Sequence, residues 1–469
     1  MKKITISPVT RIKGSWKIDV YIENGVIKEA LSSGTSFKGL EDILQNRDPR
    51  DAPYLTARVC GICSVAHSIT STTAIEVAVN HQIPRNATLI RNLLYGSDIL
   101  QSHLRQIYLL SILDYVEGPD HPPFTPRYTK GYRLPKSLND ELLGHYFKNI
   151  DLQRKAHEMV TLWGGKAPHN HGVVFGGATV HPTSEILKAF ISMLDDIRQF
   201  IDNELFYDFD VLSRYYDDYY QLGNTRGNFI NFGMFPKADD KKDLHFSKGI
   251  VFGLNHDIQE LNEEKIAEYV GYSYYSQDKE ALHPLQGTTR PNYPKENAYS
   301  WVKAPRYDGE PFETGPIGRL WISNKYRSGS STLDRIYARV LETKILSDLM
   351  LEWIDQLEPG KPIHNPVTLP ANFQGVGLHE AMRGALGHWV VVRNSKIAHY
   401  QIVTPSTWNC SPKDDRGIRG TIEEALIGTP IEDTNNPIEI GRIVRSFDPC
   451  LSCAVHTIEG SNNISTFSI

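Results

Sequence analysis

Four of the five cysteines in this chain of 469 residues are arranged as two C-x-x-C pairs. Cys60 and Cys63 form the first pair, and Cys450 and Cys453 form the second, near the other end of the chain. The two thiolates of such a pair lie about one turn apart and can bind one metal ion, so two pairs supply four sulfur ligands, a set that selects soft or borderline metals. The spacing therefore predicts one metal centre to which both ends of the chain contribute.

Three other interpretations of the cysteines stay open at this point. A structural zinc site usually has its two pairs within roughly 15 to 20 residues of each other, whereas most of the chain separates Cys63 from Cys450. A redox dithiol needs one C-x-x-C and leaves the second pair without a purpose. Two unrelated buried pairs would be purely structural, and a partly buried free thiol is the default interpretation of Cys410. A metal enclosed by most of the chain favours catalysis over a structural role.

The composition is that of a globular protein with no excess of positive charge. Hydrophobic residues make up 40% and charged residues 22%, and 50 Lys and Arg face 55 Asp and Glu. A net charge of -5 argues against a general nucleic-acid binder, which needs positive charge to neutralise phosphates. Apolar stretches stay shorter than the roughly 20 residues of a membrane-spanning helix, and the first residues turn polar before a signal-peptide core forms. We therefore expect no nucleic-acid partner and no direct membrane span, and export would depend on a partner.

Sequence patterns predict an α+β fold that is predominantly helical and forms a single large unit. No internal repeat, low-complexity tract or linker divides the chain. Apolar residues at helical spacing predict long core helices over three segments: about 30 residues from a cap at Asn86, Ser184 to Tyr220, and Ser331 to Leu357 with a Ser331-x-x-Asp334 cap.

Small peripheral β-sheets or hairpins complete the predicted fold. The pairs Asn24-Gly25 and Asn394-Ser395 suit tight turns between two strands. Short strands and loops are expected from about 225 to 330, where Gly, Pro, Asn and Tyr are frequent. Asn436 followed by Pro437 predicts the cap of a short helix that leads to the second cysteine pair.

The segments around the cysteines carry a family resemblance. Residues 58–67 read R-V-C-G-I-C-S-V-A-H, and residues 448–456 read D-P-C-L-S-C-A-V-H. These segments resemble the two signature motifs of the large subunit of nickel-iron hydrogenases. The resemblance covers essentially the whole chain through S-P-V-T-R-I at 7–12, G-L-E at 39–41, G-A-L-G-H-W at 384–389 and P-S-T-W-N at 405–409. The related respiratory complex I subunit has a similar fold but lacks the four cysteines.

The resemblance implies a nickel-iron centre that splits H2 reversibly into protons and electrons. Cys60 and Cys450 would be terminal nickel ligands, while Cys63 and Cys453 would bridge nickel to an iron that carries carbon monoxide and two cyanides. Heterolytic splitting gives a proton and a hydride, and Cys450 is the usual proton acceptor in the family. Electrons would pass to iron-sulfur clusters in a separate small subunit, because too few cysteines are left here to hold clusters.

The resemblance also assigns four groups around the metals. Arg383 would lie over the iron cyanides, Ser406 would donate to a cyanide, His67 would donate to the bridging sulfur of Cys63, and Asp448 would line the pocket beside Arg383. Outside these motifs, an Arg and an Asp most often pair at a surface, and a lone His is most often a satisfied core residue.

A magnesium site and a removable tail follow from the same resemblance. Glu41, the backbone oxygen of Ile402 and His456 would bind magnesium, a hard ion that prefers oxygen and retained waters. Family members end at this histidine after an endopeptidase removes a short tail. We therefore expect residues 1–456 to be the catalytic domain and residues 457–469 to be removed once metal-insertion factors have acted, although a frayed terminus is the simpler interpretation.

Several positions depart from the family pattern, among them Ser15 in place of a histidine. Lys13 stands where the family has the glutamate that carries protons away, and it could relay protons only if burial beside the nickel favoured its neutral form. Ser102 replaces a pocket aspartate found in some members, and Met382 replaces a proline before the family arginine.

The resemblance leaves the location and two alternative functions open. Residues 409–433 most resemble the respiratory uptake branch, whose members usually work on the outer side of a membrane after export on the partner's signal. A periplasmic or outer-face location is therefore expected, with the cytoplasm as the alternative. The alternative functions are a regulatory H2 sensor, although sensors often lack the removable tail, and a metal-binding scaffold without turnover, which only Lys13 favours.

Overall fold

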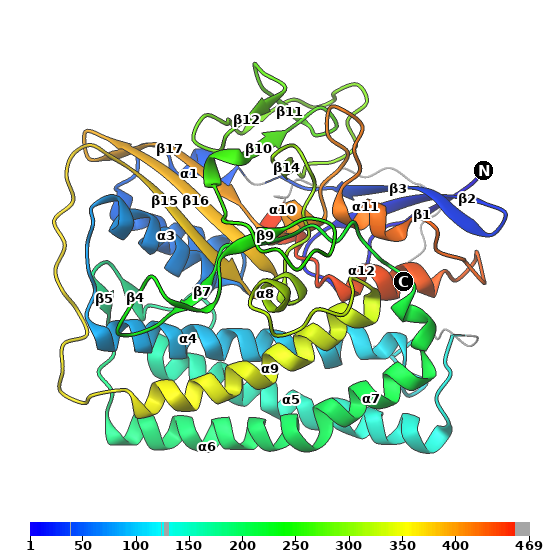
Figure 1. Ribbon diagram of the computed structural model, residues 1–469, viewed down its shortest axis with the longest axis horizontal. Coiled ribbons are helices and arrows are strands. Elements are labelled where there is room, and N and C mark those ends of the chain that lie inside the picture. Colours follow the sequence, from blue (N-terminus) through cyan, green and yellow to red (C-terminus); the bar gives the residue numbers. More distant parts are fainter. Residues whose placement is uncertain (38, 123, 126–130, 455–469) are drawn as a thin grey trace.

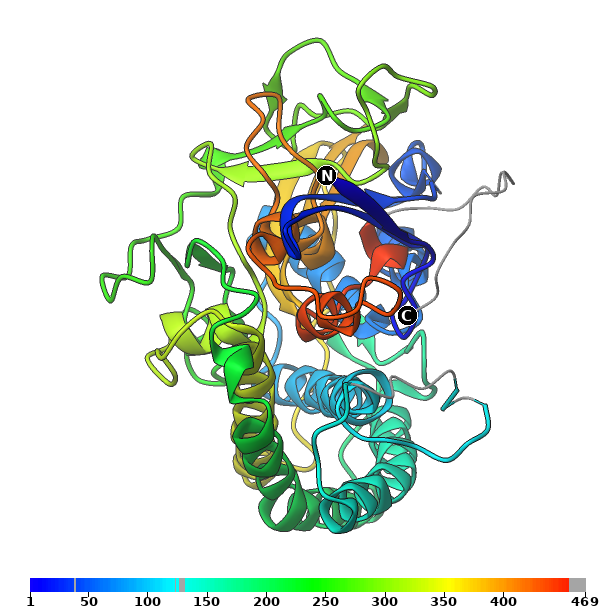
Figure 2. The same ribbon diagram turned by 90° about the vertical axis from the view of Figure 1, so that its right-hand side faces the viewer.

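Long helices packed side by side form one half of the molecule (Figures 1 and 2). The computed structural model describes residues 1–37, 39–122, 124–125 and 131–454. The long helices are α4 (Arg85–Leu104), α5 (Lys136–Gly164), α6 (Ser184–Phe200) and α9 (Thr332–Asp355). Helix α4 contacts both α5 and α9, and nearly all of its side chains are buried. A helix buried on all sides is a core helix.

The predicted helices agree with the structure better in their extent than in the residues that cap them. Helix α4 begins at Arg85 after Pro84, and it continues through a π-helical segment, Arg105–Ser111, to a 3-10 turn. The predicted cap at Asn86 is wrong, because its side chain donates instead to the backbone oxygen of Glu358 at 2.7 Å. The Ser331 capping box of α9 is confirmed.

The second predicted helix is interrupted, and one long helix was not predicted. The segment from Ser184 comprises α6, a π-helical turn (Ile201–Leu205), α7 (Phe206–Tyr215) and a 3-10 turn that ends at Tyr220. Helix α5 was missed because its buried stripe contains polar Asn149 and Gln153, which weaken the periodic apolar signal.

Two of the three three-stranded antiparallel sheets among the described residues are formed by the N-terminal and C-terminal parts of the chain. The first joins β1 (Lys2–Ile6), β2 (Trp16–Glu23) and β3 (Val26–Gly34), and the second joins β15 (Phe373–Ala381), β16 (Gly384–Arg393) and β17 (Lys396–Val403). Both predicted hairpins are confirmed, since Asn24, Gly25, Asn394 and Ser395 all have positive φ. Residues 225–330 contain the expected short strands and loops, together with one short helix, α8 (Pro316–Ile322).

Helix α3 (Ser64–Ala78) follows the first cysteine pair directly and packs on β15 and β16. The contact is close because β15 carries glycines where the helix crosses it. A Cβ on Gly377 would lie 2.3 Å from the backbone oxygen of Thr70. Only glycine allows this approach, which places the middle of α3 against the sheet.

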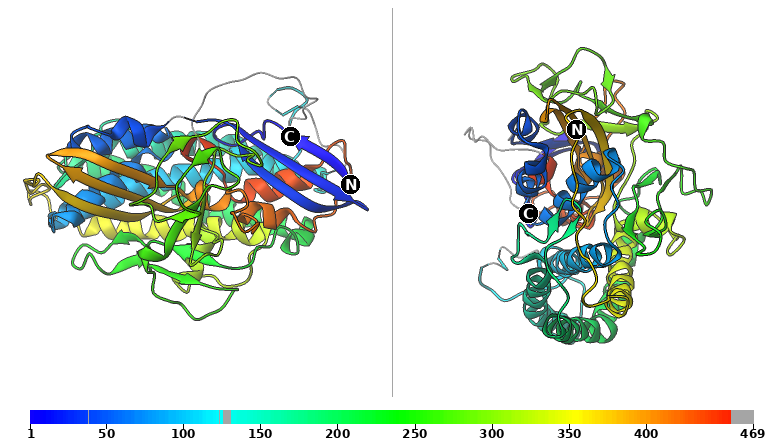
Figure 3. Two further views of the ribbon diagram at one scale, coloured as in Figure 1. Left: turned by 90° about the horizontal axis from the view of Figure 1, so that it is seen from above. Right: turned by 90° about the vertical axis from the view of Figure 1, so that its left-hand side faces the viewer.

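The two ends of the chain pack against each other (Figures 2 and 3). Strands β1 to β3, coloured blue, share an apolar cluster with α12 (Ile438–Ser446) and with Leu451 in the short α13 (Leu451–Ala454). The N–H of Leu451 donates to the backbone oxygen of Lys13 at 2.7 Å. Helix α12 begins after Pro437, so the predicted cap at Asn436 is wrong.

The predicted fold class is confirmed: the described residues form an α+β structure with long helices and small sheets. Among them, no helix combines the length and the apolar character that crossing a bilayer requires.

A buried arginine connects the helices to the sheet. Arg319 of α8 pairs with Glu342 of α9 through Nε and Oε1 at 2.6 Å, and with Glu380 of β15 through Nη1 and Oε2 at 2.8 Å. All three side chains are fully buried. Burial alone would raise the pKa of Glu342, but Arg319 holds that pKa at about 2.

We expect Arg319→Met to lower the free energy of unfolding by about 3–5 kcal/mol, because removing one partner leaves buried carboxylates unpaired. Equilibrium urea unfolding of the purified chain measures the change. The control is Arg154→Met on α5, which breaks exposed ion pairs to Asp151 and Glu158 and should leave the midpoint unchanged. Equal midpoints for the two variants would contradict this role of Arg319.

Candidate metal centre

The fold brings the two cysteine pairs into one buried cluster. Cys60 lies between a 3-10 turn and α3, Cys63 caps α3, and the second pair flanks and enters α13. The Sγ atoms of Cys63 and Cys453 are 3.0 Å apart, those of Cys450 and Cys453 are 3.0 Å apart, and those of Cys60 and Cys450 are 3.5 Å apart. The exposed fraction of each cysteine is 6% or less. The four sulfurs can therefore face one metal centre.

The crowded thiols of this cluster would be stabilised in their ionised form by a bound cation. Hydrogen bonds from Cys450 and its neighbours lower the pKa of Cys60 well below its ordinary value, whereas hydrogen bonding to Cys450 raises the pKa of Cys63 and burial raises that of Cys453. Four crowded thiolates cannot all be ionised in a dry site without compensating charge. Metal binding would release the remaining protons.

An arginine and an aspartate close one side of the cluster. Arg383 donates from Nε to the backbone oxygen of Asp448 at 2.8 Å and from Nη2 to its Oδ1 at 3.0 Å. Nη1 of Arg383 and Oδ2 of Asp448 are buried and lack a hydrogen-bond partner among the described residues. Burial alone would lower the pKa of Arg383, but Asp448 and the cysteines raise it. The guanidinium stays charged and offers a donor to a ligand with acceptor atoms.

Ser406 and His67 also lie against the cysteine segments. Ser406 Oγ accepts the backbone N–H of Cys450 at 2.9 Å, which leaves the hydroxyl hydrogen for an acceptor in the site. The backbone N–H of His67 donates to the oxygen of Cys63 at 3.2 Å, one turn into α3. Its ring contacts His388, with 3.0 Å between Nδ1 and Nε2.

A second, smaller polar site lies next to Cys453. Glu41 and Ile402 line a cavity of about 20 Å³ together with Cys453. Oε2 of Glu41 is buried without a hydrogen-bond partner among the described residues, and burial raises the pKa of Glu41 to about 7. His456 lies outside the described residues, as does the tail at residues 457–469.

The sequence did not point to three polar residues that line the same small cavity. Glu268 accepts from Gln401 at 2.9 Å and from Lys303 at 3.4 Å through its Oε2. Glu268 and Lys303 come from the loop-rich region before residue 330, where no motif indicates a site. The position of Gln401 next to Ile402 was the one available sign.

The residues that depart from the family pattern have distinct surroundings. Lys13 is exposed in this chain. Met382 is fully buried. Ser102 accepts from Arg105 Nη2 at 3.3 Å. One turn before Ser102, Asp98 is buried near Cys60 and Arg383, and burial raises its pKa to about 7.

The unpaired Cys410 is fully buried, and burial raises its pKa well above the ordinary value. This thiol is more enclosed than the sequence suggested.

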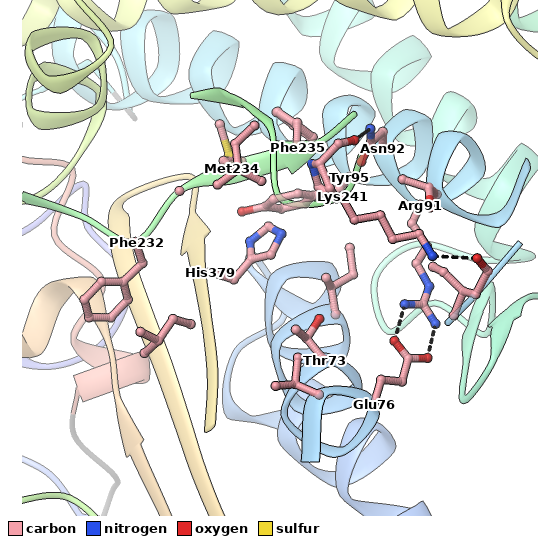
Figure 4. Close-up of a pocket in the computed structure, with 18 of the residues that line it drawn as sticks. Thr73, Glu76, Arg91, Asn92, Tyr95, Phe232, Met234, Phe235, Lys241 and His379 are labelled. Atoms are coloured by element: carbon pink, nitrogen blue, oxygen red, sulfur yellow. Dashed lines mark hydrogen bonds and ion pairs between the residues drawn. The ribbon is translucent and has the colours of Figure 1, made fainter. Parts of the chain in front are cut away.

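A cavity of about 330 Å³ lies beside the C-terminal half of α3 (Figure 4). Its lining includes Tyr95, Phe235 and His379, and a paired Glu76 and Arg91 stand at one side. Burial lowers the pKa of His379 to about 4, so the ring is neutral. The lining contains no cysteine, and this cavity is therefore not the metal centre.

This chain matches known proteins over nearly its full length. The family model described as nickel-dependent hydrogenase matches residues 38–120, 117–329 and 323–456. The chain is 37% identical to the periplasmic [NiFeSe] hydrogenase large subunit of Desulfomicrobium baculatum, over 97% of this chain and 95% of that protein. It is 31% identical to the hydrogenase-2 large chain of Escherichia coli, with 98% of each covered. It is 30% identical to the uptake hydrogenase large subunit of Rhodobacter capsulatus, with 97% and 95% covered.

The structure agrees with these matches. The H2-activated [NiFeSe]-hydrogenase of Dm. baculatum superposes with a TM-score of 0.94 at 37% identity, covering 97% of this chain and all of that one.

We expect a thiol oxidant to join the two ends of the metal-free chain covalently. Diamide treatment should link a peptide containing Cys60 and Cys63 to one containing Cys450 and Cys453, because sulfurs 3.0 Å apart need only small rotations to reach the bond length of about 2.05 Å. Peptide mass spectrometry without reduction detects the link. A link between Cys450 and Cys453 is also compatible with their separation of 3.0 Å. Cys410 is the internal control and should stay unlinked, and a link from either C-x-x-C pair to Cys410 would contradict the arrangement.

Proposed function

The chain belongs to the nickel-dependent hydrogenase family, and we propose that Cys60, Cys63, Cys450 and Cys453 hold its nickel and iron. It is a hydrogenase large subunit, an oxidoreductase that acts on H2, and a small subunit is its partner. The observation that carries the metal assignment is the buried cluster of four sulfurs built from both ends of the chain.

The donor set fits a nickel-iron group. Three of the sulfurs, those of Cys60, Cys63 and Cys453, lie within 4.8 Å of one another, and Cys450 completes the set. Thiolates are the soft ligands that such metals select, and this sequence offers sulfur at all four positions. Cys60 and Cys450 would bind nickel as terminal ligands, and Cys63 and Cys453 would bridge to iron. When bound, the group supplies the centre at which H2 is split heterolytically into a proton and a hydride.

Arg383 and Ser406 would hold diatomic ligands on the iron. The unpartnered Nη1 of Arg383 and the hydroxyl hydrogen of Ser406 are donors in a buried site. Carbon monoxide and cyanide need such donors or an apolar wall, since unpaired polar groups are costly in a dry pocket. Asp448 holds the arginine in place from the same segment as Cys450.

Cys450 would take the proton at its Sγ. The bond from its N–H to Ser406 fixes the start of α13, and full burial keeps water from the sulfur. Lys13 is exposed and would not replace the family glutamate as the next acceptor within this chain.

The small cavity beside Cys453 supports a magnesium site. Glu41 would bind through its unpartnered Oε2 and Ile402 through its backbone oxygen, with His456 as a third ligand. The network of Glu268, Lys303 and Gln401 could orient the waters that magnesium retains.

Residues 1–456 would form the catalytic domain, and residues 457–469 a peptide removed by an endopeptidase after metal-insertion factors have acted. The end of the family match at residue 456 supports this boundary. We propose that the enzyme works in the periplasm or on the outer face of the membrane through its partner, as the name of the Dm. baculatum relative states for that protein. A cytoplasmic enzyme is the alternative.

We expect purified, active protein to contain one nickel and one iron per chain and to show infrared bands of carbon monoxide and cyanide. Elemental analysis and infrared spectroscopy measure both. Zinc in place of nickel and iron, or metal content without those bands, would contradict the proposed centre. The control is the Cys453→Ser variant, which should lose the iron signals because a bridging ligand is removed.

We expect nickel-loaded protein to end at His456, because closing the site around Cys453 follows metal insertion. Intact mass spectrometry gives the terminus, and protein made without nickel should keep the full chain to Ile469. Active, loaded protein that still carries residues 457–469 would refute the processing step.

A further inference from the structure

A closed chain of buried hydrogen bonds connects the helix of the first cysteine pair to the sheet behind it. His67 Nδ1 lies 3.0 Å from His388 Nε2, His388 Nδ1 lies 2.8 Å from the hydroxyl of Tyr400, and that hydroxyl donates to Ser71 Oγ at 2.9 Å. All four residues have an exposed fraction of 2% or less.

The geometry of this chain is that of a clasp. His67 and Ser71 lie four residues apart on the same face of α3, whereas His388 comes from β16 and Tyr400 from β17. The chain therefore leaves α3 at one turn, crosses two strands and returns to α3 at the next turn. The ring of His67 cannot rotate without breaking contacts on the sheet.

The hydrogens in the chain run in one direction. The single hydroxyl hydrogen of Tyr400 goes to Ser71, so the phenol oxygen accepts from His388 Nδ1–H. A neutral imidazole that carries its hydrogen on Nδ1 has none on Nε2, and the ring of His388 is fully buried. His388 Nε2 must therefore accept, and His67 donates to it from Nδ1.

We infer that His388 and Tyr400 are positioning residues for H2 activation, which act by fixing the ring orientation and the Nδ1 hydrogen of His67. With Nδ1 bonded to His388, any contact between this ring and the thiolates is made by Nε2. His67 follows Cys63 by one turn and donates its backbone N–H to the Cys63 oxygen. In the proposed centre, where His67 would donate to the sulfur of Cys63, the clasp would determine which ring nitrogen makes that contact, and through it the electron density on the metals. This inference rests on the proposed nickel-iron centre.

The test is Tyr400→Phe, which keeps the ring and removes the hydroxyl at the centre of the clasp. We expect nickel and iron content to stay at the wild-type level, the carbon monoxide and cyanide bands to shift, and kcat to fall by roughly 10-fold with an unchanged KM for H2. Ser71→Ala should shift the bands in the same direction by less, and Ser71→Thr, which keeps a hydroxyl, should restore them.

Tyr108→Phe is the matched control. Tyr108 is a fully buried tyrosine whose hydroxyl donates to Asp208 at 2.6 Å in the helical half. The Tyr108→Phe variant should leave the carbon monoxide and cyanide bands unchanged, because the hydroxyl that it removes does not contact α3.

Unshifted bands in Tyr400→Phe with full metal content would overturn the inference, and so would equal shifts in Tyr400→Phe and Tyr108→Phe. If Tyr400→Phe does not take up metal, Ser71→Ala decides by the same criterion. Absence of these bands in the wild-type protein would instead refute the proposed centre, which separates the two outcomes.

Discussion

The structure depends on bringing four thiolates from the two ends of the chain into one dry cluster. Crowded sulfurs repel once ionised, so the protein must hold them together before a metal compensates their charge. Two features do this. The backbone of Lys13 pairs with the segment of Cys450 as an isolated β-bridge. Asp114, at the end of the long central helix, accepts from both Arg11 and Arg445. These contacts connect the N-terminal segment, the helical half and α12.

Buried charge is used in the same way throughout the core. Arg319 joins α8, α9 and β15. Arg383, the residue just before β16, joins that strand to the segment before Cys450. Each arginine is satisfied by carboxylates or backbone oxygens from distant parts of the chain, which is the condition under which a buried cation is tolerated. Arg383 differs in one respect, since its Nη1 lacks a protein acceptor among the described residues. An unpartnered donor beside the sulfur cluster is suited to hold a ligand rather than another side chain.

Helix α3 connects the first cysteine pair to the sheet of β15, β16 and β17. Gly377 lets the helix approach β15 closely, and the clasp from His67 through His388 and Tyr400 to Ser71 prevents it from sliding or turning on the sheet. The sulfur of Cys63 at the helix start is therefore positioned by contacts over two turns. A metal centre that needs fixed ligand geometry gains from such support.

The sequence by itself determined the chemistry and most of the elements. Two C-x-x-C pairs identify a sulfur site, the flanking motifs indicate the family, and local turn chemistry at Asn24-Gly25 and the Ser331 cap predicts a hairpin and a helix start, because these signals act between neighbouring residues. Only the tertiary structure decided what depends on distant partners. It buried polar Asn149 and Gln153 in α5, assembled Glu268, Lys303 and Gln401 beside Glu41, exposed Lys13, and joined His67 to His388 and Tyr400. The physical reason is that a polar side chain is placed by hydrogen bonds across the fold, and no local pattern records the partner.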